Sequence, residues 1–232
     1  MEINKIIPQF YYDLLSRVLP GFTLILLFSA SLNANVFRHV NQYLDESSAL
    51  QDSSFAMILF YLLVSYLIGQ LLSPLSSFFE QNIVAKLFPK NFNLLKNIIT
   101  GKDLSFPPEI IQFIEDETNI NKDNLKQEDD TQLRKYIFIW YDWLKIYKPE
   151  IGANIVKMRA QASMHVAITL ITLLSIVVYL AAVSLDYVEI DVLHIAFYLL
   201  IIFLCLWGTI RTHKMFRWGV ISHYYICKSS NP

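Results

Sequence analysis

The feature that constrains this chain most is the run over residues 160–185, in which only His165 can carry a charge near neutral pH. With a rise of about 1.5 Å per residue, a helix of this length more than covers the roughly 30 Å hydrocarbon core of a bilayer. Lys157 and Arg159 precede the run, and Asp186 follows it. Because basic residues collect on the cytoplasmic side, we expect a membrane-spanning helix that starts in the cytoplasm and ends outside.

The composition agrees with an integral membrane protein. The chain is 54% hydrophobic and 17% charged, with a net charge of −1 and a mean hydropathy of +0.39. These values exclude a disordered chain and an ordinary soluble domain, and the net charge does not favour general nucleic-acid binding. The two cysteines have neither the number nor the spacing of a disulfide framework or a zinc site.

Four apolar runs predict four transmembrane helices, over residues 18–32, 55–75, 160–185 and 192–210. A fully buried helix of a large soluble protein is the alternative for one such run, but four runs in 232 residues favour a membrane protein. A cleaved signal peptide is the alternative for the first run. Asp13 and the length of the preceding segment are atypical of such a peptide.

Proline and glycine predict breaks in the first two spans. The pair Pro20-Gly21 is expected to end an N-terminal interfacial helix where the chain enters the membrane. In the second span, Gly69, Ser73 and Pro74 predict an interruption at the inner end.

Charge placement predicts the topology. The loop over residues 33–54 holds Arg38 as its only Lys or Arg, whereas residues 76–159 hold 12 of the 19 Lys and Arg residues. With both termini and this insert in the cytoplasm, 18 of the 19 lie inside. We therefore expect an all-α, multi-pass membrane protein with a helical cytoplasmic insert between the second and third spans. The expected domains are residues 1–75 (interfacial helix and first hairpin), 76–159 (insert), 160–210 (second hairpin) and 211–232 (basic tail).

Two helices are predicted inside the insert. Pro107-Pro108 suits the first turn of a helix that reaches Thr118. Asp129 and Gln132 resemble a capping box that opens a second helix through Tyr147. One face of this second helix is apolar and is expected to pack against other helices or the bilayer, although stacking on bases is an alternative. Its members are Leu133, Tyr136, Ile137, Trp140, Trp143, Leu144 and Tyr147.

The sequence contains no pattern typical of catalysis. It lacks a phosphate-binding glycine loop, a nucleophile elbow and a clustered set of metal ligands, and its five histidines are scattered. We therefore expect no enzyme activity, no cofactor and no metal site. The four predicted spans also lack Asp, Glu, Lys and Arg, which disfavours ion-coupled transport.

Two sets of residues are candidates for a functional site. Polar groups within the spans can line a pore formed by several copies, although they can equally allow close helix packing; these are Gln70, Ser163, Thr169 and Thr172. Basic groups just beneath the second and fourth spans can bind a cytoplasmic nucleotide or oligonucleotide; these are Lys86, Lys90, Arg211, Lys214 and Arg217. The alternative is that these basic groups only set the orientation of the chain in the membrane and contact anionic lipid.

Residues 11–21, Tyr-Tyr-Asp-Leu-Leu-Ser-Arg-Val-Leu-Pro-Gly, precede four spans with one large cytoplasmic insert. This segment and architecture resemble the small four-span membrane proteins of bacterial anti-phage defence, first the Hailong membrane effector and second the Kiwa membrane component. The resemblance implies an oligomeric, normally closed channel or membrane-disrupting effector of the bacterial inner membrane, controlled from the cytoplasm by a nucleotide-derived ligand or a partner protein. The alternative is a non-conducting anchor or sensor that recruits a soluble defence protein to the membrane.

Overall fold

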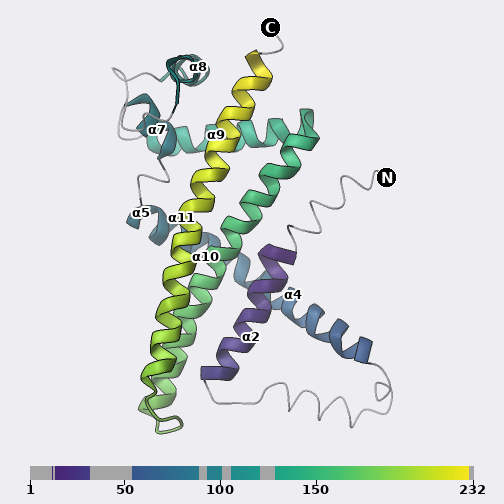
Figure 1. Cartoon of the computed structure of the whole chain (residues 1–232), viewed down its shortest axis with the longest axis vertical. Coiled ribbons are helices and arrows are strands. Elements are labelled where there is room, and N and C mark those ends of the chain that lie inside the picture. Colours follow the sequence, from purple (N-terminus) through teal and green to yellow (C-terminus); the bar gives the residue numbers. More distant parts are fainter. Residues whose placement is uncertain are drawn as a thin grey trace. The chain divides into compact units, whose positions relative to one another are not determined.

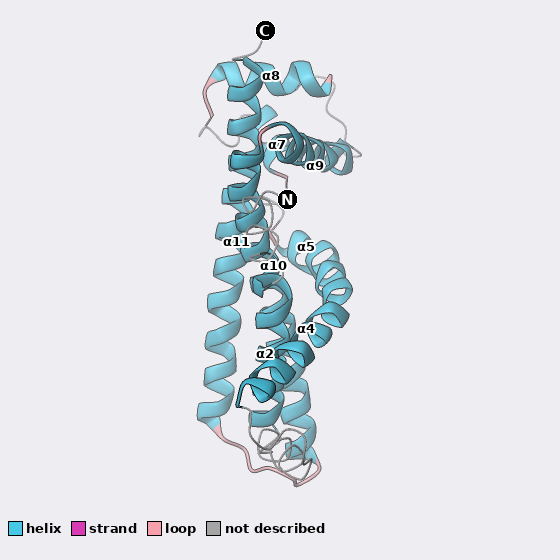
Figure 2. Ribbon diagram, turned by 90° about the vertical axis from the view of Figure 1, so that its right-hand side faces the viewer, coloured by secondary structure: helices cyan, strands magenta, loops and turns pink. Residues whose placement is uncertain are grey.

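The computed structural model describes Tyr12 and residues 14–31, 54–88, 93–100, 106–120 and 129–229, apart from the side chains of residues 54–57 and 129–131. Within these ranges every regular element is a helix (Figure 2). Four helical segments are long and apolar enough to cross a membrane, which confirms the predicted all-α class and the four candidate spans. Most of the predicted loop over residues 33–54 lies outside the described residues.

The helices that contain the four apolar runs extend beyond the predicted spans (Figure 1). They comprise η1 (Leu14–Val18, a π-helical turn) with α2 (Leu19–Ser31), α4 (Ser54–Phe79), α10 (Pro149–Ser184) and α11 (Val192–Ser229). The shorter elements are η2 (Glu80–Val84, π-helical), α5 (Ala85–Leu87), α7 (Leu94–Ile99), α8 (Pro108–Thr118) and α9 (Asp129–Tyr147). The predicted ends at Thr118 and Tyr147 are confirmed.

The predicted breaks at proline are wrong. Pro20 is the second residue of α2, and the turn before it, η1, is π-helical. A π turn changes the hydrogen-bond spacing just where the proline lacks an N–H group, so the helix continues. Pro74 lies inside α4, which continues without a break to Phe79. A single proline in an apolar helix is tolerated when neighbouring groups satisfy the freed backbone.

Contacts along the chain divide it into two compact units. The first, here called the apolar unit, comprises Phe10–Glu80 and Ala160–Thr209. The second, here called the insert unit, includes Gln81–Arg159 and Ile210–Pro232. The basic tail therefore packs with the insert, and α10 and α11 supply residues to both units.

Two glycines determine how closely α4 approaches the first helix in the apolar unit. A Cβ atom on Gly21 would overlap the carbonyl oxygen of Ser65, and one on Gly69 would overlap the carbonyl oxygen of Arg17. Gly69 is four residues from Ser65, and Gly21 is four residues from Arg17, so each helix presents a small residue to the backbone of the other. Small residues at this spacing allow helix backbones to come into direct contact.

A buried group of hydroxyls joins α2, α10 and α11. The Ser31 Oγ atom lies 2.7 Å from the Tyr198 Oη atom and 3.2 Å from the Ser175 carbonyl oxygen. The Leu27 carbonyl oxygen accepts from Ser31 Oγ at 2.7 Å and from Tyr198 Oη at 3.3 Å. Ser31 and Tyr198 are at most 1% exposed. Buried hydroxyls cost free energy unless they are hydrogen-bonded, so this group favours one arrangement of the three helices.

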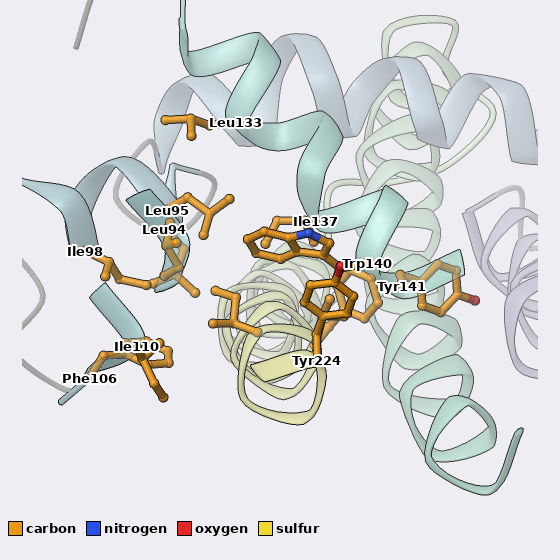
Figure 3. Packing of buried hydrophobic residues seen from close by; sticks show 14 of the residues in the cluster. Leu94, Leu95, Ile98, Phe106, Ile110, Leu133, Ile137, Trp140, Tyr141 and Tyr224 are labelled. Carbon is orange, nitrogen blue, oxygen red and sulfur yellow. The ribbon is translucent and has the colours of Figure 1, made fainter. Parts of the chain in front are cut away.

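The insert unit has an aromatic and aliphatic core centred on α9 (Figure 3). Trp140 and Leu144 on this helix are at most 1% exposed, so the predicted apolar stripe is a packing face. Tyr147 is the exception, being 62% exposed at the end of the helix. Other buried members of the core are Leu94, Leu95, Ile98, Phe106, Ile110, Ile114, Ile155, Phe216, Val220 and Tyr224.

Tyr224, in the part of α11 that follows its apolar residues, connects that helix to α8. Its hydroxyl donates to the Glu117 Oε2 atom over 3.3 Å. Burial, together with the Glu117 carboxylate, raises the pKa of Tyr224 to about 12. The hydroxyl therefore remains protonated and able to donate in moderately alkaline solution as well as at neutral pH.

Candidate functional site

The five basic residues predicted to bind an anion do not form one exposed group. Lys86 on α5 and Arg211 and Lys214 on α11 are exposed, Arg217 is buried, and Lys90 lies outside the described residues. A step of three residues falls about 60° short of a full helical turn, so Arg217 points about 120° away from Arg211. This drift turns Arg217 toward the core of the insert unit.

Arg217 shares a small hollow in the insert unit with two basic residues that were not predicted as site residues, Lys96 of α7 and Arg134 of α9. The Arg134 Nε and Nη2 atoms donate to the Asn93 Oδ1 atom over 2.9 and 2.6 Å. The hollow has a volume of about 10 Å³, which is enough for one water molecule. Three basic residues therefore border this hollow, but it is too small to hold a nucleotide.

The sequence held only a partial signal for this hollow. Arg134 was placed on the polar side of α9, opposite the Trp140 stripe, and Lys96 belongs to the basic part of the insert. Their proximity to Arg217 depends on the packing of α7 and α11 against α9. Sequence spacing cannot show such a long-range approach.

The apolar unit contains a second polar cluster, formed by Arg17, Tyr66 and Gln70. The Tyr66 Oη atom accepts from Arg17 Nη1 at 3.1 Å and from Gln70 Nε2 at 2.8 Å. The Arg17 guanidinium also lies 5.9 Å from the Tyr12 ring centroid and 5.8 Å from that of Tyr66. Gln70, a predicted pore residue, is half-buried here.

Arg17 lies within the first apolar helix, because the segment long enough to cross a membrane is Leu14–Ser31. Arg17 therefore falls inside this longer candidate segment, although the expected span over residues 18–32 contains no charged residue. The expected span began at residue 18, since Pro20-Gly21 was interpreted as a break. An arginine in such a helix needs polar or aromatic partners, and Tyr66 and Tyr12 supply them.

The other predicted pore residues lie on α10. Thr169 and Thr172 are at most 1% exposed, and Ser163 is half-buried. Thr169 donates to the His165 carbonyl oxygen and Thr172 to that of Ile168, each over 2.8 Å. Within one chain, the two threonines satisfy their hydroxyls on their own helix, and their pore-lining role stays a prediction.

The described residues contain no group of three or more His, Cys, Asp and Glu side chains that could hold a metal ion. His165 packs on α11, where a Cβ atom on Gly208 would come within 2.8 Å of its ring. The described polar groups that come together most closely are the cluster of Arg17, Tyr66 and Gln70 and the buried hydroxyls of Ser31 and Tyr198. Both join neighbouring helices.

No known protein family, curated protein or solved structure matches the chain.

Proposed function

We propose that this chain is a multi-pass inner-membrane protein that assembles into an oligomeric channel or membrane-disrupting effector, gated from the cytoplasm by the insert unit. A role in anti-phage defence belongs to this proposal and rests on the resemblance carried by residues 11–21 and the four-span architecture.

The observation that carries the proposal is the uncovered apolar surface of α4 and α11. Within one chain, 17% of the most apolar window of α4 and 11% of that of α11 are buried. The large exposed side chains include Leu63, Leu67, Leu71, Phe197, Phe203, Leu204 and Trp207. Such a surface is covered in a bilayer by lipid and by neighbouring helices, and symmetric assemblies of identical chains are common.

Control by the insert unit is supported by the helices that the two units share. Ile155 of α10 and Phe216, Val220 and Tyr224 of α11 belong to the insert core. The same two helices continue as the apolar hairpin. A ligand or partner that binds one packing of the insert core more tightly than another would shift the population of helix arrangements.

Planar-bilayer recordings of the purified full chain test this function. We expect discrete current steps, which increase when Trp140→Ala loosens the insert core; protein-free bilayers and the surface variant Gln132→Ala serve as controls. Absence of current from both the wild type and the Trp140→Ala variant, with each shown to be inserted, would contradict the channel.

The burial of Thr169 and Thr172 favours a second candidate function. Because these side chains face the interior of one chain, the polar surface available for a pore on α10 is reduced. The second candidate is a non-conducting membrane anchor or sensor that recruits a soluble defence protein to the insert unit. Bilayers without current, together with recovery of a stoichiometric soluble protein on the full chain, would favour this candidate.

A further inference from the structure

The outward face of α9 carries large apolar side chains. Phe138, Ile139 and Ile146 are 40%, 58% and 71% exposed. They lie on the opposite side of the helix from Trp140 and Leu144, which fill the core of the insert unit. We propose that this outward face of α9 lies on the headgroup surface of an anionic bilayer.

Arg159 places this face near the membrane boundary. Its guanidinium lies 4.7 Å from the Phe138 ring centroid, 5.5 Å from that of Tyr141 and 5.8 Å from that of Phe216. Arg159 is also the last residue before the uncharged run over residues 160–185. An arginine at such a boundary directs its charged end toward the lipid phosphates. Phe138 is therefore held beside the residue at which α10 becomes apolar.

The charges on α9 fit an anionic surface. Lys135 and Lys145 are exposed next to the apolar group. Asp142 is the acidic side chain described on the same side, and it lies 3.8 Å from Lys145. A helix that combines an exposed apolar group with basic residues is typical of binding in the interfacial plane of a membrane. Binding to a lipid surface also explains why this face lies beside Arg159, the last residue before the apolar run. Binding to a second copy of the chain or to a soluble protein would not require that position.

Depth-dependent quenching tests the proposal on the full chain in nanodiscs. Cys205 and Cys227 are replaced by alanine, and single cysteines are introduced as Ile139→Cys or Ile146→Cys and labelled with an environment-sensitive fluorophore. Asp116→Cys, on the exposed side of α8, is the matched control. With a lipid-borne nitroxide in phosphatidylcholine and phosphatidylglycerol, we expect quenching several-fold greater at positions 139 and 146 than at position 116.

A charge-reversed variant tests whether Lys135 and Lys145 attract this face of α9 to anionic lipid. Lys135→Glu with Lys145→Glu should reduce quenching at position 146 in anionic nanodiscs, to about the level seen with phosphatidylcholine alone. Intrinsic tryptophan fluorescence checks that the core remains folded. Equal quenching at all three positions, no effect of the double charge reversal, or cross-linking of position 139 to a second copy would each overturn the proposal. It depends on the presence of the chain in a bilayer and is independent of whether the chain conducts.

Discussion

The indole ring of Trp140 lies nearly parallel to the phenol ring of Tyr224, with centroids 5.1 Å apart and 13° between the planes. Trp140 is on α9 and Tyr224 on the part of α11 that belongs to the insert unit. Stacked aromatic pairs contribute specific geometry as well as buried area. This pair therefore holds the basic tail against the insert.

Trp140→Asp should strongly destabilise the insert unit. Truncating a buried tryptophan to alanine costs about 3–5 kcal/mol, and an unpaired buried carboxylate adds a further penalty. Thermal unfolding of the full chain in detergent measures the effect, with Gln132→Asp on the exposed side of α9 as the control. Unchanged stability and oligomer size in Trp140→Asp would show that this face is not a core.

Gly69→Ala should loosen the contact between α4 and the first helix, since the new methyl group would overlap the Arg17 carbonyl. Gly219→Ala is the matched control, because its Cβ would lie 3.6 Å from the Met158 sulfur, an ordinary contact. In a helix without such a clash, alanine is favoured over glycine by about 1 kcal/mol. We expect a lower unfolding temperature for Gly69→Ala and an equal or higher one for Gly219→Ala. The reverse order would exclude the close approach.

Tyr66→Phe should leave two donors, Arg17 Nη1 and Gln70 Nε2, without their shared acceptor. Loss of a hydrogen-bond partner lowers the free energy of unfolding by about 1–3 kcal/mol when the remaining group is buried. Because these groups are only half-buried, we expect a value near the lower end of this range. A double-mutant cycle with Gln70→Leu, followed by chemical denaturation, measures the coupling. Tyr187→Phe, at a residue that is 79% exposed, should not change the stability. A coupling free energy of zero between positions 66 and 70 would show that this cluster does not stabilise the protein.

Cysteine labelling in intact cells tests the orientation. In a chain whose native cysteines are replaced, Glu189→Cys between α10 and α11 should react with an impermeant maleimide. Asp116→Cys on α8 should react only after the cells are opened. This expectation follows from the distribution of Lys and Arg between the loops. Labelling of position 116 alone in intact cells would mean that the topology is inverted.

Local sequence signals were sufficient for the bounds of the two predicted insert helices, α8 and α9. Pro108, the first residue of α8, is a proline in the first helical position. Asn119 adopts a left-handed conformation, with φ 53°, where α8 ends. The breaks predicted at Pro20 and Pro74 were wrong because the effect of a proline inside an apolar helix depends on the turns and helices around it.

The candidate sites were less predictable because they depend on contacts between distant residues. Arg217 was predicted as part of an exposed basic group, and the packing of α11 in the insert core buries it instead. The proximity of Arg17 to Tyr66 follows from the glycine contacts between their helices. The sequence shows which residues are basic and how far apart they are along the chain. The tertiary packing decides which of them lie close together.

Native mass spectrometry of the full chain released from lipid nanodiscs tests the central claim most directly. The proposed channel requires several copies around one axis, which would cover apolar surface of α4 and α11 that one chain leaves exposed. We expect a defined assembly of more than one chain over a range of protein concentrations. A single chain per nanodisc under all these conditions would contradict it.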